Sequence, residues 1–200
     1  MIAIIDYGAG NLHSVKNALD FLEAESIISN NSEEILACDK IILPGVGAFG
    51  HAMDALTASG LHKTVLKAVE AEKPLLGICL GLQLMFEESD EAPGKKGLGI
   101  FSGKIVKIPD TGLKIPHMGW NSLEVSPNTR LLKGLGDEPY VYFVHSYYLT
   151  TEQEDVVSAY TNYGARLGVA VERGNVFATQ FHPEKSGDIG MKILKNFINI

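Results

Sequence analysis

The stretch KPLLGICLGLQLMFEES (73–89) places an apolar run directly before a cysteine that stands between two glycines. The run 74–78 predicts a buried strand, and the amphipathic segment after the cysteine predicts a helix. Cys79 therefore lies where a strand turns into a helix, with Gly77 and Gly81 on either side. Small flanking residues allow the close approach of strand and helix that characterises a nucleophile elbow.

The predicted helix start makes Cys79 chemically interesting. The positive end of a helix dipole favours a thiolate, and the N–H of Leu80 can face a developing oxyanion. For the isolated pattern, a small buried cysteine between packing glycines is an equally good interpretation. The second cysteine, Cys38, follows an apolar segment and is expected to be a packing residue.

Short apolar runs alternate with helical patterns over the first half of the chain. The runs at 2–5, 25–29, 40–45 and 74–78 are nearly continuous in apolar residues. Such strands are typical of a parallel sheet covered by helices on both faces. Because an amphipathic segment at about 51–70 and other helical patterns separate them, we predict an α/β domain.

The second half predicts an antiparallel or mixed extension of the sheet, because its strand patterns follow one another through turns. These patterns are GKIVKI (103–108), NSLEV (121–125), YVYFVHSYYL (140–149), VVSAY (156–160), LGVAVE (167–172) and NVFATQF (175–181). A final helix is expected at about 189–198. No repeat, low-complexity tract or linker interrupts the chain, so residues 1–200 are predicted to form a single domain.

Composition limits the classes of protein to consider. The chain has 200 residues, of which 46% are hydrophobic and 20% charged, which indicates a folded protein with a substantial core. Its net charge of −7 argues against nucleic acid or an anionic membrane as a main partner. The two cysteines form neither a disulfide framework nor a zinc motif. With no signal peptide pattern and no apolar run of roughly 20 residues, a cytoplasmic protein is expected.

A cysteine nucleophile needs a base, and His182 is the best placed of the six histidines. It follows the strand pattern 175–181, so it is expected at the same sheet edge as Cys79. Glu184 is close enough to bond the far ring nitrogen, and Pro183 stiffens the link. Alone, this segment would be better interpreted as a surface His-Pro-Glu turn; together with the elbow cysteine it favours a triad.

Two glycine-rich loops also follow predicted strands. In LPGVGAFG (43–50) the glycines permit unusual backbone angles, so the N–H groups of Val46 and Gly47 are candidate oxyanion donors. This loop lacks the lysine and Ser/Thr of a P-loop. The loop DYGAGN (6–11) lacks the third glycine of a dinucleotide motif, so no nucleotide cofactor is predicted.

Several motifs together resemble a known family. The segments GICLGLQ (77–83), PGVGAFG (44–50) and FHPEKS (181–186) resemble the class I, triad-type glutamine amidotransferases. More narrowly, DYGAGNLHSV (6–15), FEES (86–89), PHMGWN (116–121) and YFVHSYY (142–148) resemble the glutaminase subunits of imidazole glycerol phosphate synthases, enzymes of histidine biosynthesis. The resemblance extends from Ile4 nearly to the C-terminus. Leu82, where the family more often has methionine, is a volume-conserving departure.

The resemblance implies a fold and a reaction. The fold would be a flavodoxin-like three-layer sandwich with a mostly parallel central sheet and an antiparallel extension. Cys79 would attack the side-chain amide of glutamine to give a γ-glutamyl thioester and ammonia, with His182 moving the proton and Glu184 orienting it. The oxyanion hole would use Leu80 N–H and a loop amide at Val46 that swings into place when a partner subunit is loaded. The substrate contacts it implies are Gly47, Gln83, His145, Ser146 and Tyr147.

The resemblance also implies a partner and no metal or other cofactor. Free ammonia would be lost to water, and in this family a (β/α)₈-barrel cyclase docks over the glutaminase site as the other half of a heterodimer. Ammonia passes through the barrel to form imidazole glycerol phosphate and an aminoimidazole carboxamide ribotide. The positions implied near that interface are Asn11, Met118, Trp120, Tyr142 and Lys185. Trp120 and Tyr142 are alternatively core aromatics, and Lys185 a solvated surface charge.

Other functions remain open at this point. The glutaminases of pyridoxal-phosphate synthase and anthranilate synthase would share the triad, but PHMGWN (116–121) and DYGAGN (6–11) argue against both. A redox sensor of the flavodoxin-like type, with Cys79 as the sensing thiol, would leave the His-Pro-Glu segment without a role. A cysteine hydrolase with the same elbow would differ in transferring ammonia to no partner. An inactive scaffold subunit is also possible, although no triad position is missing.

Overall fold

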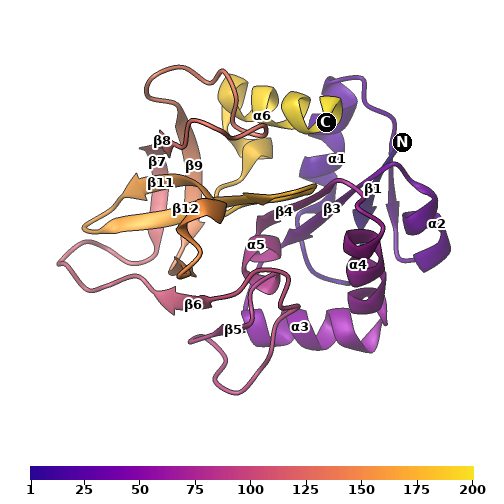
Figure 1. The fold of residues 1–200 in the computed structure, drawn as a ribbon, viewed down its shortest axis with the longest axis horizontal. Helices are drawn as coiled ribbons and strands as arrows, with labels where there is room; N and C mark the ends of the chain where they lie inside the picture. Colours follow the sequence, from indigo (N-terminus) through magenta and orange to yellow (C-terminus); the bar gives the residue numbers. More distant parts are fainter.

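Strands from both ends of the chain form the parallel part of one large sheet. In the computed structural model, which describes all 200 residues, β1 (Ile2–Ile5) lies between β2 (Ser26–Ser29) and β3 (Lys40–Gly45). On the other side of β3 comes β4 (Leu75–Cys79), followed by β13 (Val176–Thr179) from the far end of the sequence. All these pairs are parallel, so the carboxyl ends of β3, β4 and β13 lie at one edge (Figure 1).

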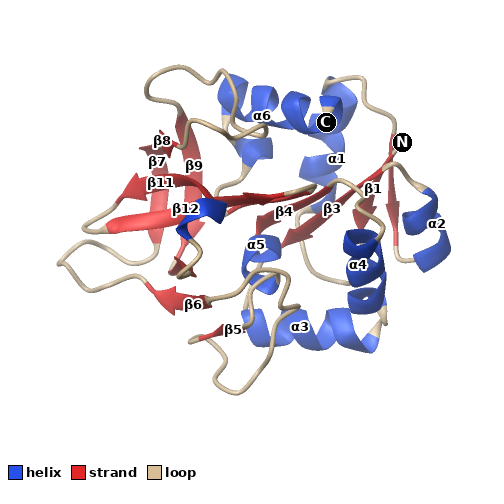
Figure 2. Ribbon diagram, viewed as in Figure 1, coloured by secondary structure: helices blue, strands red, loops and turns tan.

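Helices cover both faces of this parallel region, as the continuous apolar strands predicted. Successive residues of a strand point to opposite faces, and in β1 Ile2 and Ile4 join one buried cluster while Ala3 and Ile5 join the other. In Figure 2, α1 and α6 lie on one side of the strands and α3 and α5 on the other. The helices are α1 (Leu12–Phe21), α2 (Ser32–Ala37), α3 (Phe49–Ala58), α4 (Leu61–Glu70), α5 (Leu80–Leu84) and α6 (Gly187–Asn199).

Mostly antiparallel strands extend the sheet beyond β13, as predicted for the second half. The order continues β12-β10-β6-β5, with β11 paired to β12 and β8 paired to β11, which makes eleven strands. A second, two-stranded antiparallel sheet consists of β7 and β9. The bounds are β5 (Glu88–Ser89), β6 (Lys104–Lys107), β7 (His117–Ser122), β8 (Glu124–Val125), β9 (Tyr140–His145), β10 (Tyr147–Thr150), β11 (Val157–Asn162) and β12 (Arg166–Arg173).

The structure divides four segments that the sequence pattern presented as continuous. The run 140–149 breaks at Ser146 into β9 and β10, which belong to different sheets. The segment 51–70 divides at Gly60, whose φ of 75° is left-handed and ends the regular helix. The helix after Cys79 has only five residues, and β5 follows it. The pattern NSLEV (121–125) is shared between β7 and β8.

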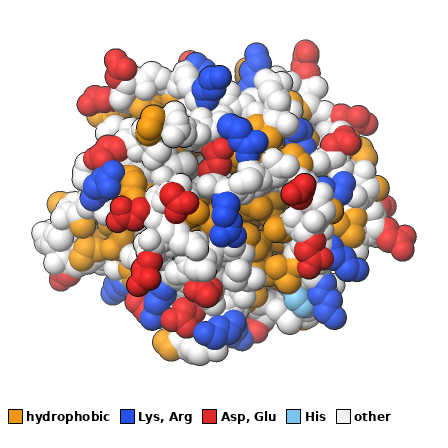
Figure 3. Space-filling view, viewed as in Figure 1, with side chains coloured by type: hydrophobic (Ala, Val, Ile, Leu, Met, Phe, Trp, Pro, Cys, Tyr) orange, Lys and Arg blue, Asp and Glu red, His pale blue; other side chains and the backbone are white.

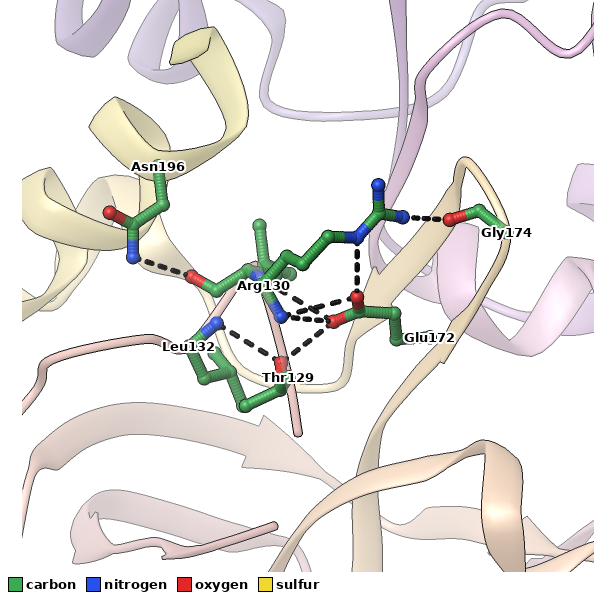
Figure 4. A network of polar contacts seen from close by, with 7 residues as sticks. Thr129, Arg130, Leu132, Glu172, Gly174 and Asn196 are labelled. Atoms are coloured by element: carbon green, nitrogen blue, oxygen red, sulfur yellow. Dashed lines mark hydrogen bonds and ion pairs between the residues drawn. The ribbon is translucent and has the colours of Figure 1, made fainter. Parts of the chain in front are cut away.

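A half-buried carboxylate ties a long loop to the extended sheet. The side chain of Glu172 on β12 is 12% exposed and accepts hydrogen bonds from Thr129 Oγ1 at 2.7 Å, Arg130 Nε at 3.0 Å and the N–H of Leu131 at 3.3 Å. Asn196 of α6 donates to the Leu131 carbonyl at 2.9 Å, so the loop is held from both sides (Figure 4). The loop is therefore bonded to both β12 and α6.

Replacing Glu172 with alanine is expected to lower the free energy of unfolding by about 3 kcal/mol, because Thr129 Oγ1, Arg130 Nε and the N–H of Leu131 lose a charged acceptor. For a chain of this size, that corresponds to a fall in Tm of roughly 6 to 12 °C. Thermal unfolding followed by circular dichroism would measure it, with the exposed Glu152 replaced by alanine as the matched control. Equal Tm values for the two variants would contradict the expectation.

Charges and helix lengths complete the description of the surface. Acidic and basic side chains are intermixed on the face shown in Figure 3. None of the helices has the length and apolar character needed to cross a membrane. No group of three or more His, Cys, Asp or Glu side chains is arranged to hold a metal ion.

Candidate active site

Three strand ends bring the predicted site residues to one edge of the sheet. In the register of the parallel strands Gly45 lies opposite Cys79, and Thr179 lies opposite Ile78. The loop after β3, the turn after β4 and the segment from Gln180 onward therefore converge. Ligands in open α/β sheets bind at this carboxyl edge.

Cys79 occupies the strained turn that the glycine spacing predicted. Its φ is 56° and its ψ −109°, a conformation that costs a non-glycine residue on the order of 1–3 kcal/mol and is concentrated at functional sites. A Cβ on Gly81 would lie 1.9 Å from the Leu43 carbonyl oxygen, and one on Gly77 would lie 2.9 Å from Met85 Cε. Both glycines are needed for α5 to pack directly on β3 and β4.

His182 and Glu184 form a buried pair at the end of β13. His182 Nδ1 lies 2.8 Å from Glu184 Oε1, and the two side chains are only 2% and 1% exposed. A short 3-10 helix, Pro183–Lys185, turns the chain so that the glutamate comes back against the imidazole. The opposite nitrogen, Nε2, is buried without a hydrogen-bond partner and belongs to the same cavity as Cys79.

The environment of His182 favours the charged ring. Burial by itself lowers its pKa, but interactions with Cys79 and Glu184 outweigh burial and raise the pKa to about 10. Both interactions favour the protonated form of the ring. An imidazolium beside a sulfur stabilises the thiolate, which is the nucleophilic form of cysteine.

A cavity of about 330 Å³ lies at this edge, and it gathers most of the residues selected from the sequence. Its walls come from the turn after β4, the loop after β3, the β9–β10 junction and the end of β13. The selected residues that line it are Val46, Gly47, Cys79, Leu80, Gln83, His145, Ser146, Tyr147 and His182. Of these, Val46 is 42% exposed at the cavity rim.

Two further polar residues of the cavity were missed by the sequence analysis. Gln180 is fully buried and directs Nε2 toward Cys79 Sγ at 3.7 Å; its place two residues before His182 was an available signal. Glu91 also lines the cavity, and its Oε2 accepts from the N–H of Phe49 at 2.7 Å. Glu91 arrives on a loop after β5, so no spacing in the sequence could have indicated it.

A pair of buried histidines forms the wall behind the β9–β10 junction. His117 of β7 lies opposite His145 of β9, and His117 Nδ1 is 2.9 Å from His145 Nε2. His145 Nδ1 is in turn 2.9 Å from the Tyr147 carbonyl oxygen. Burial lowers the pKa of each ring to about 4, so both are neutral at neutral pH. Both nitrogens of His145 thus face protein groups rather than the cavity.

This pair predicts a loss of stability in mild acid. Below the ordinary histidine pKa of 6.5 the unfolded chain gains a proton on His117 and on His145, whereas the folded protein does not until about pH 4. The free energy of unfolding should therefore fall as pH falls through this range, by up to about 1.4 kcal/mol per pH unit for each histidine. Urea unfolding across the range should show a shallower slope for His117→Phe. The exposed His51→Gln variant should retain the full slope; equal slopes in both variants would contradict the assignment.

The five selected interface positions lie around the same edge. Met118 and Trp120 on β7 are 62% and 56% exposed, and Lys185 is exposed beside Glu184. Tyr142 is half-buried, with its ring 6.2 Å edge-to-face from Trp120. Asn11 lines a narrow gap behind His182 and Glu184. Trp120 is therefore not a core aromatic.

A larger hollow, of about 610 Å³, lies away from the strand ends around Arg130. Two of its charged groups, Arg130 and Glu172, already bond each other and the surrounding backbone. It contains neither a cysteine nor a histidine, and we place the functional site at the smaller cavity, which holds Cys79 and His182.

Fold and site together define an α/β amidotransferase with a cysteine at the strand-to-helix turn. The chain belongs to the class I glutamine amidotransferase family, whose family model, described as "Glutamine amidotransferase class-I", matches residues 3–200. This confirms the resemblance drawn from the motifs, and it makes the chain a glutamine amidotransferase.

Its sequence relatives are more specific than the family. The "Imidazole glycerol phosphate synthase subunit HisH" of Methanocaldococcus jannaschii is 52% identical over 200 residues and is covered completely, as is this chain. The protein of the same name from Methanothermobacter thermautotrophicus is 50% identical, with 100% of this chain and 98% of the relative covered.

The fold is shared with solved structures of more distant proteins. One described as a glutamine amidotransferase has a TM-score of 0.77 at 23% identity, with both chains fully covered. The structure of PurLQS from Thermotoga maritima has a TM-score of 0.74 at 20% identity, with 99% of this chain and 97% of that chain covered. The α/β fold with a mostly parallel sheet and an antiparallel extension is thus confirmed.

Proposed function

We propose that this chain is the glutaminase subunit of an imidazole glycerol phosphate synthase. It hydrolyses glutamine to glutamate and delivers the ammonia to a (β/α)₈-barrel cyclase subunit. The observation that carries the proposal is the meeting of Cys79 with the buried His182–Glu184 pair in one cavity. Full-length relatives of about 50% identity bearing this name support the choice within the family.

The first half of the reaction releases ammonia. The Cys79 thiolate attacks the carbonyl carbon of the glutamine side-chain amide and forms a tetrahedral oxyanion. His182 Nε2–H donates its proton to the amide nitrogen as the C–N bond breaks, so ammonia leaves and a γ-glutamyl thioester remains. Glu184, on Nδ1, keeps the ring oriented and stabilises its charged form.

The second half regenerates the enzyme. The now neutral His182 Nε2 takes a proton from water, which attacks the thioester carbonyl. Collapse of this second tetrahedral intermediate breaks the C–S bond, releases glutamate and restores the Cys79 thiolate beside an imidazolium. His182 Nε2, which is buried without a hydrogen-bond partner in the structure, gives up a proton in the first half of the cycle and takes one up in the second.

Two backbone N–H groups would hold the oxyanion. Leu80 begins α5, and the first N–H groups of a helix have no intrahelical partner. The second donor is the loop amide at Val46, which lies between Gly45 and Gly47. Gly47 has φ of 96°, and nothing lies within 4 Å of the place its Cβ would take, so the loop has room for a peptide rotation. If this peptide rotates only when the partner subunit is loaded, the oxyanion hole would be complete only in the loaded complex.

The remaining lining residues suit a free amino acid. Glu91 is the one carboxylate among the lining residues, and we assign it to the α-ammonium group of glutamine. Gln83 directs Nε2 to the Tyr147 carbonyl and to Gln180, which leaves its Oε1 as the unused acceptor of that amide. Gly47 and the segment 145–147 supply backbone and short polar groups for the substrate carboxylate.

The outer face of the small β7–β9 sheet is the proposed docking surface. Met118 and Trp120 on β7 are exposed, and Tyr140 and Tyr142 on β9 alternate with buried residues and belong to the same face. The neighbouring Val144 lines the cavity, so a barrel seated on this face would also cover the cavity mouth. Lys185 would form an ion pair with an acidic residue of the partner. In the assembled cytoplasmic enzyme, ammonia would then enter the barrel and yield imidazole glycerol phosphate and the carboxamide ribotide.

The test is glutamate release from glutamine, measured for the chain alone and then with a barrel cyclase and its ribonucleotide ligand. We expect weak activity that rises sharply in the loaded complex. Strong activity without a partner would indicate a free-standing hydrolase, and the synthase assignment would be wrong.

A further inference from the structure

Hydrogen bonds fix the position of the proton on both rings of the buried histidine pair. The Tyr147 carbonyl can only accept, so the His145 Nδ1 that faces it at 2.9 Å carries the hydrogen. In a neutral ring Nε2 is then an acceptor, so His117 Nδ1, 2.9 Å away, must be the donor. His117 Nε2 is left as an acceptor and faces Asn121 Nδ2 at 3.4 Å. Each ring thus carries its hydrogen on Nδ1.

A second set of hydrogen bonds connects the Tyr147 carbonyl with the Cys79 sulfur. Gln83 Nε2 faces the Tyr147 carbonyl at 3.5 Å and Gln180 Oε1 at 3.0 Å. With its oxygen turned toward Gln83, Gln180 directs Nε2–H to Cys79 Sγ at 3.7 Å. The orientation of both amides therefore follows from one backbone carbonyl, and the group that reaches the sulfur is a donor.

We propose that His117 is a positioning residue of the glutaminase site, acting through His145, the Tyr147 carbonyl and the Gln83–Gln180 pair on the Cys79 sulfur. It touches neither the nucleophile nor the cavity. Its effect is to hold the Tyr147 carbonyl where Gln83 can meet it, so that Gln180 donates to the thiolate. This deepens the proposed function and rests on it only in taking Cys79 as the nucleophile.

The surroundings of His117 suit a fixed donor. Its ring is stacked between Phe143 and Tyr163, with centroids 4.7 Å and 4.0 Å away, and its residue is 3% exposed. Asn121, which bonds Nε2, is itself anchored to the Asn162 carbonyl at 3.0 Å. These contacts prevent the ring from turning and exclude water, so no solvent donor can replace it.

The first measurement is made on the wild-type full-length chain. Long-range ¹H–¹⁵N NMR spectra distinguish the two neutral tautomers of histidine, and both His117 and His145 are expected to carry hydrogen on Nδ1. Hydrogen on Nε2 of either ring would overturn the proposal, whatever any variant does.

The second measurement compares two substitutions by the rate at which iodoacetamide alkylates Cys79 at neutral pH. His117→Phe retains an aromatic ring in the stack but has no donor, and about a tenfold slower rate is expected, on the scale of one lost hydrogen bond to a charged group. His117→Asn places its amide nitrogen where Nδ1 was, and a rate within about threefold of wild type is expected, on the scale of a weakened neutral hydrogen bond. Mass spectrometry resolves the site, and slow labelling of the buried Cys38 reports that each variant remains folded.

Other results would contradict the proposed series of hydrogen bonds from His117 to Cys79. A wild-type rate in His117→Phe would overturn it, and so would equal slowing in both variants while His145 keeps its Nδ1 hydrogen. Correct tautomers and a slowed His117→Phe variant in a chain that never hydrolyses glutamine would instead overturn the proposed function, whereas the hydrogen-bonded connection from His117 to Cys79 would stand.

Discussion

Replacing Cys79 with alanine is expected to abolish glutamine hydrolysis while leaving the fold intact. The thiolate makes the covalent bond on which both halves of the proposed reaction depend, so a loss of about 10⁴-fold or more in kcat/KM is expected. The side chain contributes little to packing that a methyl group would not, and alanine tolerates the strained backbone about as well as cysteine. Glutamate release and thermal unfolding, measured on the same preparation, would test both halves of this expectation.

The second cysteine provides the matched control. Cys38 is also buried, but its Sγ donates to the Glu34 carbonyl at 3.3 Å at the end of α2, remote from the cavity. Cys38→Ala should retain wild-type activity and lose a little stability. Residual turnover near wild type in Cys79→Ala would eliminate Cys79 as the nucleophile and would remove the basis of the proposed mechanism.

The site could be anticipated from the sequence because parallel strands fix where their ends lie. Once the runs at 40–45, 74–78 and 175–181 are assigned to one sheet, the residues after each must meet at its carboxyl edge. Cys79, Val46 and His182 were selected on that ground, and the structure places all three around one cavity. No side-chain contact had to be known in advance.

The divided strands show where this reasoning ends. Both β9 and β10 alternate with period two, and a period says which residues share a face but not which sheet a strand joins. Nothing in the sequence marks Ser146 as a break between two strands. Before it, β9 pairs with β7, and after it, β10 pairs with β6. Only the tertiary structure decides between such partners.

The residues that the sequence did not indicate act across long separations. Glu91 reaches the N-terminus of α3 from a loop 42 residues later, and Glu172 accepts from a loop 43 residues earlier. A single carboxylate carries no local pattern that reveals a distant partner. His117 likewise gains its significance only from its register opposite His145.

Gly81→Ala is expected to cause a large loss of stability. The new Cβ would lie 1.9 Å from the Leu43 carbonyl oxygen, and neither β3 nor α5 can move away without separating from the sheet. We expect the free energy of unfolding to fall by about 3 kcal/mol or more, which lowers Tm by roughly 6 to 12 °C or prevents folding.

A control for Gly81→Ala is available within a neighbouring helix. Gly50 lies in α3, where a Cβ would meet only the Ala92 methyl group at 3.2 Å, and alanine is favoured over glycine in a helix by about 1 kcal/mol. Gly50→Ala should therefore be close to neutral in thermal unfolding. If Gly81→Ala were equally neutral, the direct packing of α5 on β3 would be wrong. The close packing of α5 on β3 could then not be the cause of the strained backbone of Cys79, whose φ is 56°.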